Sequence, residues 1–295
     1  YDPASAASLI AASGTIGVVI PPSVPMIIYA VIAQQSVSSL FLNGFLPGLA
    51  MGIALMAIAI TQAYKRKYPK GTPLSLASIW RTLKAASWGL MTPVVILGGI
   101  YSGIFTPTEA AGVGCTGVLL TAAAGRRLTR RAMSKALEET ALISAMIFAI
   151  IVGGYLVARF LAITGITQDL VSMLVGMELG RVPFLMLLVL LYLVLGAMLD
   201  VFGMLVLTIP FVMPVVGELG IDPVWFGVFA VVMAELALVT PPIGANVFVM
   251  RRVAPDVPMG EIFRGVLPFV VGELVIIALL VAFPELALWL PRQMS

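Results

Sequence analysis

Histidine is absent from this chain of 295 residues, and cysteine occurs once, as Cys115. Without histidine the chain cannot form a Ser-His-Asp or Cys-His catalytic centre, a histidine-ligated metal site or a histidine proton relay. A single cysteine excludes an intrachain disulfide. Charged residues are also scarce, at 11% of the chain, compared with about 25% in an ordinary soluble domain. The composition therefore gives little support to an enzyme.

Hydrophobic residues make up 61% of the chain, and its mean hydropathy is +1.11. A soluble protein of this composition could not cover its surface with polar groups. We therefore predict an all-α polytopic membrane protein that lies in a lipid bilayer. The net charge of +3 is typical of Lys and Arg in cytoplasmic loops, and we expect no nucleic-acid partner.

Apolar runs alternate with basic connections along the chain. Runs long enough to cross a bilayer occur at 40–64, 142–164 and 266–290. Basic residues concentrate at 65–84 and 126–135, which the positive-inside rule places in the cytoplasm. Amphipathic stretches at 74–87 and 128–140 are either interfacial helices or helical connecting loops.

Two further apolar segments contain breaks. Segment 4–30 includes Pro21-Pro22, and segment 224–250 includes Pro241-Pro242. Proline inside a helix removes an amide donor and costs about 3 kcal/mol or more. At membrane depth such a break persists only where protein or a wet cavity satisfies the freed backbone groups. We therefore expect broken helices that line a cavity.

The two broken segments belong to an internal repeat. When Asp2-Pro3 is placed on Asp222-Pro223, the double prolines coincide, because 17 residues separate the two dipeptides in both copies. With one inserted residue, 44–47 then falls on 265–268, and each ends in Leu-Pro. Paired broken helices in corresponding halves indicate the midplane binding site of a transporter. We predict an inverted-repeat architecture.

A hairpin precedes the second copy. The apolar run from Pro183 is interrupted at Gly196–Asp200 and resumes to Val216, and each arm is short for a complete span. This pattern favours a re-entrant helical hairpin. The first copy should have an equivalent hairpin before Tyr1, so we expect the chain to be part of a longer protein.

Four stretches carry a resemblance to a known family: Ser13–Ser23, Gly103–Ala111, Glu235–Asn246, and the tip Gly196–Asp200 with the following Leu207–Pro210. They resemble the signatures of the large membrane subunit of tripartite ATP-independent periplasmic (TRAP) transporters. The resemblance implies an elevator-type, ion-transporter-like fold and a multi-pass protein of the bacterial inner membrane. It also implies sodium-coupled import of organic anions, such as C4-dicarboxylates or sialic acids, with a small membrane subunit and a periplasmic substrate-binding protein as partners.

With this architecture we divide the chain into seven segments. They are the broken helix of repeat 1 in the transport domain (1–39), a scaffold helix with a connecting arm (40–87), a helix pair with a second arm (88–141), the entry helices of repeat 2 (142–182), its re-entrant hairpin (183–220), its broken helix (221–257) and a C-terminal scaffold helix (258–295).

The resemblance makes Na⁺ the expected coupling ion, and a hard monovalent cation prefers neutral oxygens. Carbonyls freed at the breaks and nearby hydroxyls supply such oxygens. The predicted sodium-binding residues are Thr15, Gly17, Pro21, Ser23, Thr208, Thr240, Pro241, Gly244 and Asn246. A packing kink without a ligand is the alternative at the breaks. The Thr208 hydroxyl could equally donate a hydrogen bond to a backbone carbonyl.

Substrate or gating roles are predicted for four residues: Gly196, Asp200, Glu235 and Arg159. Asp200 is either the N-cap of the second hairpin arm or an ion ligand. Arg159 either pairs a substrate carboxylate or snorkels to the interface. The buried acid Glu273 is interpreted as a satisfied scaffold group. Thr106 to Glu109 is typical of a capping box.

Two rival functions remain open at this point. A single-component sodium–anion symporter of related fold would need no binding protein. A channel is also compatible with an internal repeat, but it does not require two kinked helices at equivalent positions.

Overall fold

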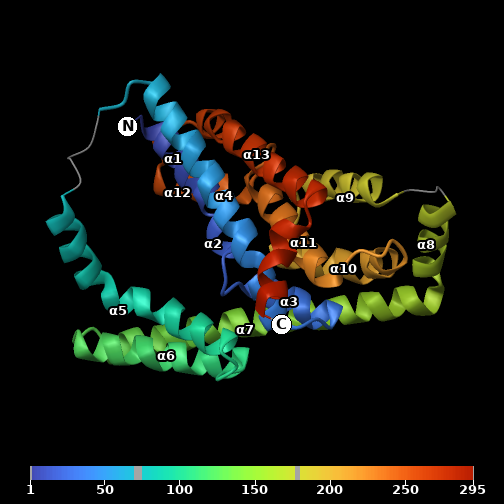
Figure 1. Ribbon diagram of the computed structural model, residues 1–295, viewed down its shortest axis with the longest axis horizontal. Coiled ribbons are helices and arrows are strands. Elements are labelled where there is room, and N and C mark those ends of the chain that lie inside the picture. Colours follow the sequence, from blue (N-terminus) through green and yellow to red (C-terminus); the bar gives the residue numbers. More distant parts are fainter. Residues whose placement is uncertain (1, 70–74, 177–179, 295) are drawn as a thin grey trace. The chain divides into compact units, whose positions relative to one another are not determined.

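The computed structural model describes residues 2–69, 75–176 and 180–294, and the regular elements in these ranges are helices (Figure 1). Four of them are long and apolar enough to cross a membrane, or up to six spans result when each of two bent pairs counts as one. This confirms the all-helical membrane class. Residues 70–74 and 177–179, within the predicted segments 40–87 and 142–182, lie outside the described part.

The chain divides into two compact units, residues 1–68 with 149–295 and residues 69–148. The second unit contains α5 (Leu76–Tyr101), α6 (Pro107–Ala124) and the first part of α7 (Arg130–Thr164). Helix α6 begins with the predicted capping box: Thr106 Oγ1 accepts the Glu109 amide, and the Glu109 carboxylate accepts the Thr106 amide. Helix α7 begins at Arg130 and runs without interruption through the rest of the stretch 128–140 and the apolar run after it, in which no proline occurs.

The first unit is built from the two copies of the repeat. The first copy consists of α1 (Pro3–Ser13), α2 (Ile16–Val19), α3 (Val24–Ala33) and α4 (Val37–Lys65). The second consists of α11 (Pro223–Val239), α12 (Ala245–Val253) and α13 (Met259–Ala282). Asp2 and Asp222 are the N-caps of α1 and α11, and each is followed by proline at the first helical position. The matched sequence signals thus start matched helices.

The two copies pack in opposite directions. Helix α1 packs against α12 and α13, whereas α11 packs against α3 and α4. The first half of each broken helix therefore lies against the second half of the other, as antiparallel copies require. Helices α1, α4 and α13 lie side by side (Figure 1). This arrangement agrees with the inverted repeat predicted from the sequence.

The remaining helices of this unit pack against both copies. Helix α9 (Arg181–Leu195) and α10 (Val201–Glu218) flank the turn at Gly196–Asp200, as expected for the two arms of the hairpin, whose re-entrant course stays a prediction. Both pack against α11; α8 (Ile166–Gly176) packs against α10, and α14 (Glu285–Met294) packs against α4.

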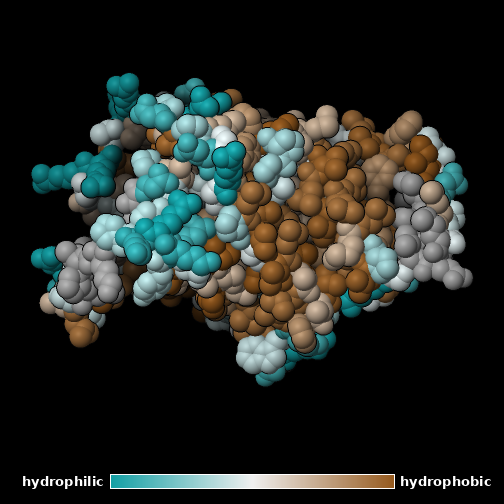
Figure 2. Space-filling view, turned by 90° about the horizontal axis from the view of Figure 1, so that it is seen from above, coloured by the Kyte–Doolittle hydropathy of each residue, from teal (hydrophilic) through white to brown (hydrophobic). Residues whose placement is uncertain are grey.

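Hydrophobic side chains also cover much of the surface. Figure 2 shows broad hydrophobic areas on the visible face. On α7, Leu156 is 68% exposed and Ile163 is 71% exposed. Exposed apolar area of this extent is typical of helices that contact lipid.

The cap at Asp222 gives a first prediction. Its Oδ1 accepts the amides of Val224 at 2.9 Å and Trp225 at 2.8 Å. We expect Asp222→Ala to lower the free energy of unfolding by about 1 kcal/mol, because both amides lose their acceptor. Thermal unfolding of the purified protein in detergent measures the change. The exposed Asp256→Ala is the control, and equal melting temperatures of the two variants would contradict the role of the cap.

Candidate functional site

The first break spans Gly14 to Ser23 around the short helix α2, and the segments Pro3–Val19 and Val24–Ala33 bend by 45° relative to each other. Pro21 and Pro22 have no amide hydrogen for the carbonyls of Gly17 and Val18, four residues earlier. Ser23 ends the break as the N-cap of α3, and its buried hydroxyl accepts the Met26 amide at 3.3 Å. The break therefore combines free carbonyls with a fixed hydroxyl.

The second break joins α11 to α12. The Thr240 hydroxyl donates to Leu236 O at 2.6 Å, and Pro241-Pro242 follows. Both double prolines are joined by a cis peptide bond. Gly244 has φ +54°, a left-handed conformation that glycine adopts without strain, and it begins α12.

The structure brings the two breaks together. Helix α2 packs against α11, and α1 packs against α12. A Cβ on Gly14, at the first break, would lie 3.7 Å from Asn246 Nδ2, which follows the second break. The prediction that both breaks contribute to one site is therefore geometrically possible.

Helix α4 approaches the backbone of the first break closely at two glycines. A Cβ on Gly44 would lie 3.2 Å from Val19 O, and one on Gly48 would lie 3.3 Å from Ile20 N. The spacing Gly44-x-x-x-Gly48 is a pattern that allows close backbone approach in membranes. The sequence interpretation missed this contact, although the spacing could have indicated it.

Two buried carboxyls lie beside the first break. Thr15 Oγ1 is hydrogen-bonded to Glu273 Oε1 of α13 at 2.6 Å and to Ala12 O at 2.8 Å. Glu235 of α11 is also buried, and α11 packs against both α2 and α13. Glu273 Oε2 has no hydrogen-bond partner among the described residues. The sequence interpretation makes Glu273 a satisfied scaffold group, and the described residues give it a hydrogen bond through Oε1 only.

The hairpin tip lies against α11. A Cβ on Gly196 would overlap the Ala237 side chain and lie 3.0 Å from Ala237 O, three residues before the second break. Exposed Asp200 accepts the Gly203 amide at 2.8 Å as the N-cap of α10, which is the capping alternative. The structure thus places the tip next to the second break.

Thr208 lies within the hairpin rather than at a break. Its buried hydroxyl donates to Met204 O at 2.8 Å and contacts the Tyr192 hydroxyl at 2.5 Å. The hydroxyl therefore donates to the backbone and links α10 to α9, and its role as an ion ligand stays a prediction.

Arg159 does not join the site. It is exposed on α7 and, within the part of the chain that the structure describes, it has no hydrogen-bond or ion-pair partner. Glu235, by contrast, is buried within α11, five residues before Thr240. Of the four predicted substrate or gating residues, Gly196 and Asp200 lie at the hairpin tip, Glu235 is buried within α11, and Arg159 is exposed on α7.

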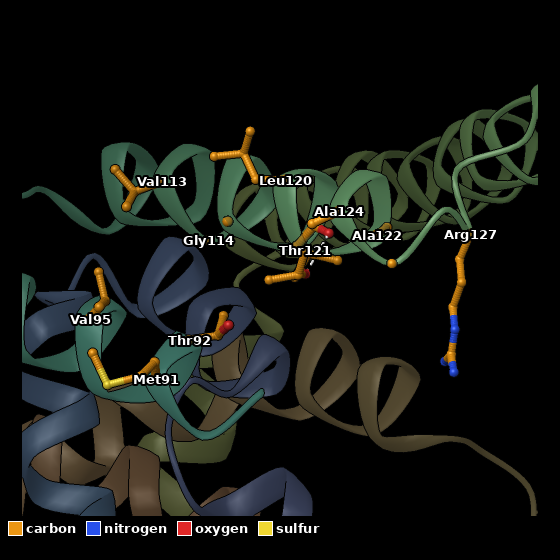
Figure 3. A pocket seen from close by; sticks show the side chains of 13 residues that line it. Met91, Thr92, Val95, Val113, Gly114, Leu120, Thr121, Ala122, Ala124 and Arg127 are labelled. Atoms are coloured by element: carbon orange, nitrogen blue, oxygen red, sulfur yellow. Dashed lines mark hydrogen bonds between the residues drawn. The ribbon is translucent and has the colours of Figure 1, made fainter. Parts of the chain in front are cut away.

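The second unit contains a separate groove. It lies between α5 and α6, has a volume of about 1130 Å³ and is lined mainly by apolar residues, including Met91, Val95 and Val113 (Figure 3). None of the predicted site residues lines it. This groove therefore plays no part in the candidate site.

Comparison with known proteins identifies a matching family and several similar proteins. Residues 1–286 match the family described as tripartite ATP-independent periplasmic transporter, DctM component. The chain is 38% identical over 297 residues to the sialic acid TRAP transporter large permease protein SiaM of Vibrio cholerae, covering 99% of this chain and 68% of that protein. It is 35% identical to the C4-dicarboxylate TRAP transporter large permease protein DctM of Pseudomonas aeruginosa, with the same coverage of 99% and 68%. The ectoine/5-hydroxyectoine permease UehC of Ruegeria pomeroyi is 30% identical, over 98% of this chain and 68% of that protein.

Proposed function

The chain belongs to the DctM-component family of TRAP transporters, and from this premise we propose that it carries out sodium-coupled import of a small organic solute across the bacterial inner membrane. Members of this family are transporter permease subunits and not enzymes. The observation that carries the proposal is the meeting of two proline-broken helices in antiparallel copies of one repeat. Such paired breaks are where secondary transporters bind their ions and substrates.

The oxygens around the breaks support sodium as the coupling ion. Thr15, Ser23, Thr240 and Asn246 offer neutral side-chain oxygens, and the prolines leave backbone carbonyls free. These are the ligand types that a hard monovalent cation prefers. Among the described residues no group of three or more His, Cys, Asp or Glu is placed to hold a metal ion, so the chemistry favours a monovalent ion over a transition metal.

An elevator movement with two partners completes the proposal. The hairpin tip at Gly196 packs directly on α11, so the hairpin and the second broken helix can move as one body. We propose that a small membrane subunit supports the stationary part and that a periplasmic binding protein delivers the solute. Both partners follow from the TRAP family type.

Relatives named for different solutes define the class of substrate to test. They include permeases for sialic acid, C4-dicarboxylates and ectoine. We propose an organic anion, with sialic acid and a C4-dicarboxylate as the first candidates. Ectoine serves as the comparison, because it is a zwitterion.

Uptake into proteoliposomes tests the function. The full-length large subunit is reconstituted with its small subunit, and the cognate binding protein is added with radiolabelled N-acetylneuraminic acid, succinate or ectoine. We expect saturable uptake of one of the two anions that requires an inward sodium gradient. Uptake that is unchanged when potassium replaces sodium would contradict the coupling. Equal uptake without the binding protein would favour the single-component symporter, and ohmic current without coupled uptake would favour a channel.

A further inference from the structure

The groove between α5 and α6 opens where the two helices stop touching. A Cβ on Gly114 of α6 would overlap the Ile96 side chain of α5, whereas a Cβ on Gly117, three residues later, would meet no heavy atom within 4 Å. Both glycines line the groove, whose volume is about 1130 Å³. Pockets for small molecules usually measure about 300–1,000 Å³. The groove therefore has room for a flexible apolar ligand.

The groove has about the length of one membrane leaflet. On α6 its lining runs from Val113 to Ala124, about 17 Å at a rise of 1.5 Å per residue. Half of a hydrocarbon core of about 30 Å is about 15 Å. Most of the lining is apolar, and Met91, Val118 and Leu120 remain exposed at 52%, 54% and 66%. These dimensions fit an acyl chain of a lipid.

One end of the groove is positively charged. Arg127, just after α6, is the one charged side chain among the described residues that line it (Figure 3). Arg126, Arg130 and Arg131 lie within four residues of Arg127 in the sequence, and all four side chains are exposed. Within the described ranges, none of these four arginines, the basic cluster, has an ion-pair partner. The apolar groove thus ends at unpaired cations.

No acidic residue close in the sequence neutralises the basic cluster. Five basic residues and no acidic one lie between 126 and 135. The next acidic residues, Glu138 and Glu139, follow on α7, and Glu139 already pairs with Lys135 at 3.6 Å. The positive-inside rule places this stretch in the cytoplasm, where basic pockets beside transmembrane helices bind anionic headgroups. Charge complementarity therefore favours a lipid with a net negative headgroup.

We propose that the groove binds one anionic phospholipid, with an acyl chain along α6 and the phosphate at the basic cluster. The two features adjoin at Arg127, as chain and headgroup adjoin in a lipid. A soluble anion would leave the apolar groove empty, and an uncharged apolar ligand would leave the cluster unpaired. The bound lipid connects the α5–α6 pair with the start of α7. This site is independent of the coupling ion and of the transported solute.

Native mass spectrometry of the complete transporter tests the proposal. The full-length large subunit with its small subunit is stripped of lipid in detergent and mixed with phosphatidylglycerol or phosphatidylcholine of identical chains. We expect the unmodified complex to bind one phosphatidylglycerol molecule about tenfold more tightly than phosphatidylcholine, since each Arg near a membrane surface contributes to the binding of an anionic lipid. Equal binding of the two lipids would overturn the proposal, even if every variant failed to insert.

A charge variant tests the headgroup contact. Arg127→Gln/Arg130→Gln should remove the preference for phosphatidylglycerol, because the phosphate loses two of its cations. The control Arg251→Gln/Arg252→Gln removes an exposed basic pair at the end of α12 and should keep the preference. A preference that persists in the first variant would show that the basic cluster does not hold the phosphate.

A groove variant tests the chain contact. Gly117→Leu places a side chain in the groove and should weaken the binding of both lipids. The control Gly112→Leu lies on the same helix, is exposed, has nothing within 4 Å of its Cβ and does not line the groove, so binding should be unchanged. Full binding by Gly117→Leu would contradict an acyl chain at this place.

Two further measurements distinguish other occupants. Glycerol phosphate, which is the headgroup without chains, should leave phosphatidylglycerol bound, and displacement would mean that the site takes a soluble phosphate instead. If the large subunit alone binds the lipid and the complete transporter does not, the small subunit covers the groove and the proposal is wrong.

Discussion

Replacing Gly17 with leucine should abolish sodium-driven uptake and leave the stability of the protein nearly unchanged. Gly17 is exposed in α2, and a Cβ there would meet no heavy atom within 4 Å. The folded chain can therefore accept a side chain, with the change of about 0.5 kcal/mol or less that is usual at exposed positions. The leucine would instead occupy the space beside the carbonyls of the first break. Uptake and thermal unfolding, measured on the same preparation, separate the two effects.

Gly244→Val provides the contrast at the second break. Gly244 has φ +54°, and a Cβ would lie 3.1 Å from Phe263 Cε1 and 3.4 Å from Thr240 O. A β-branched residue in this conformation costs about 1–3 kcal/mol. This variant should therefore lose both stability and uptake, whereas Gly17→Leu loses uptake alone.

The matched control for both variants is Gly260→Leu. Gly260 is exposed in the first turn of α13, and a Cβ there also meets nothing within 4 Å. Because it lies away from the breaks, uptake should be retained. Full uptake by Gly17→Leu would show that no ion or substrate passes beside the first break.

Local sequence chemistry predicted where helices begin and break. Thr106 and Asp200 were predicted as caps because a short acceptor beside free amides acts within three residues of its own position. The double prolines break helices for an equally local reason, the missing amide. The matched spacing of these signals was then sufficient to predict the repeat.

Long-range contacts could not be predicted in this way. The hydrogen bond between Thr15 and Glu273 joins residues separated by 258 positions. The sequence identifies Glu273 as an acid in an apolar run, but it does not show which helix the acid faces. The same holds for Arg159, whose position in an apolar segment predicts a functional charge and which the structure places on an exposed face of α7. Both cases depend on how the helices pack against one another. The spacing of residues within one segment carries no information about that packing.

The contact between the hairpin tip and α11 gives the second large effect. Any side chain at Gly196 would overlap Ala237 Cβ and meet the Ala237 carbonyl carbon and oxygen at 3.0 Å. Backbone atoms cannot move aside as a flexible side chain does, so Gly196→Val should force the tip away from α11. We expect the free energy of unfolding to fall by about 1–3 kcal/mol. Uptake should be lost, because the tip contacts Ala237, which lies three residues before the second break.

Two companion variants identify the cause of that loss. Gly217→Val lies on the second arm of the same hairpin, is exposed and has nothing within 4 Å of its Cβ, so it should behave as the wild type. Adding Ala237→Gly to Gly196→Val removes the overlapping Cβ and leaves the carbonyl at 3.0 Å, so the rescue should be partial. If Gly196→Val and Gly217→Val lose the same amount of uptake, close packing of the tip on α11 is not what transport requires. A selective loss with partial rescue would mean that the hairpin and the second broken helix act as one body, which the proposed elevator movement requires.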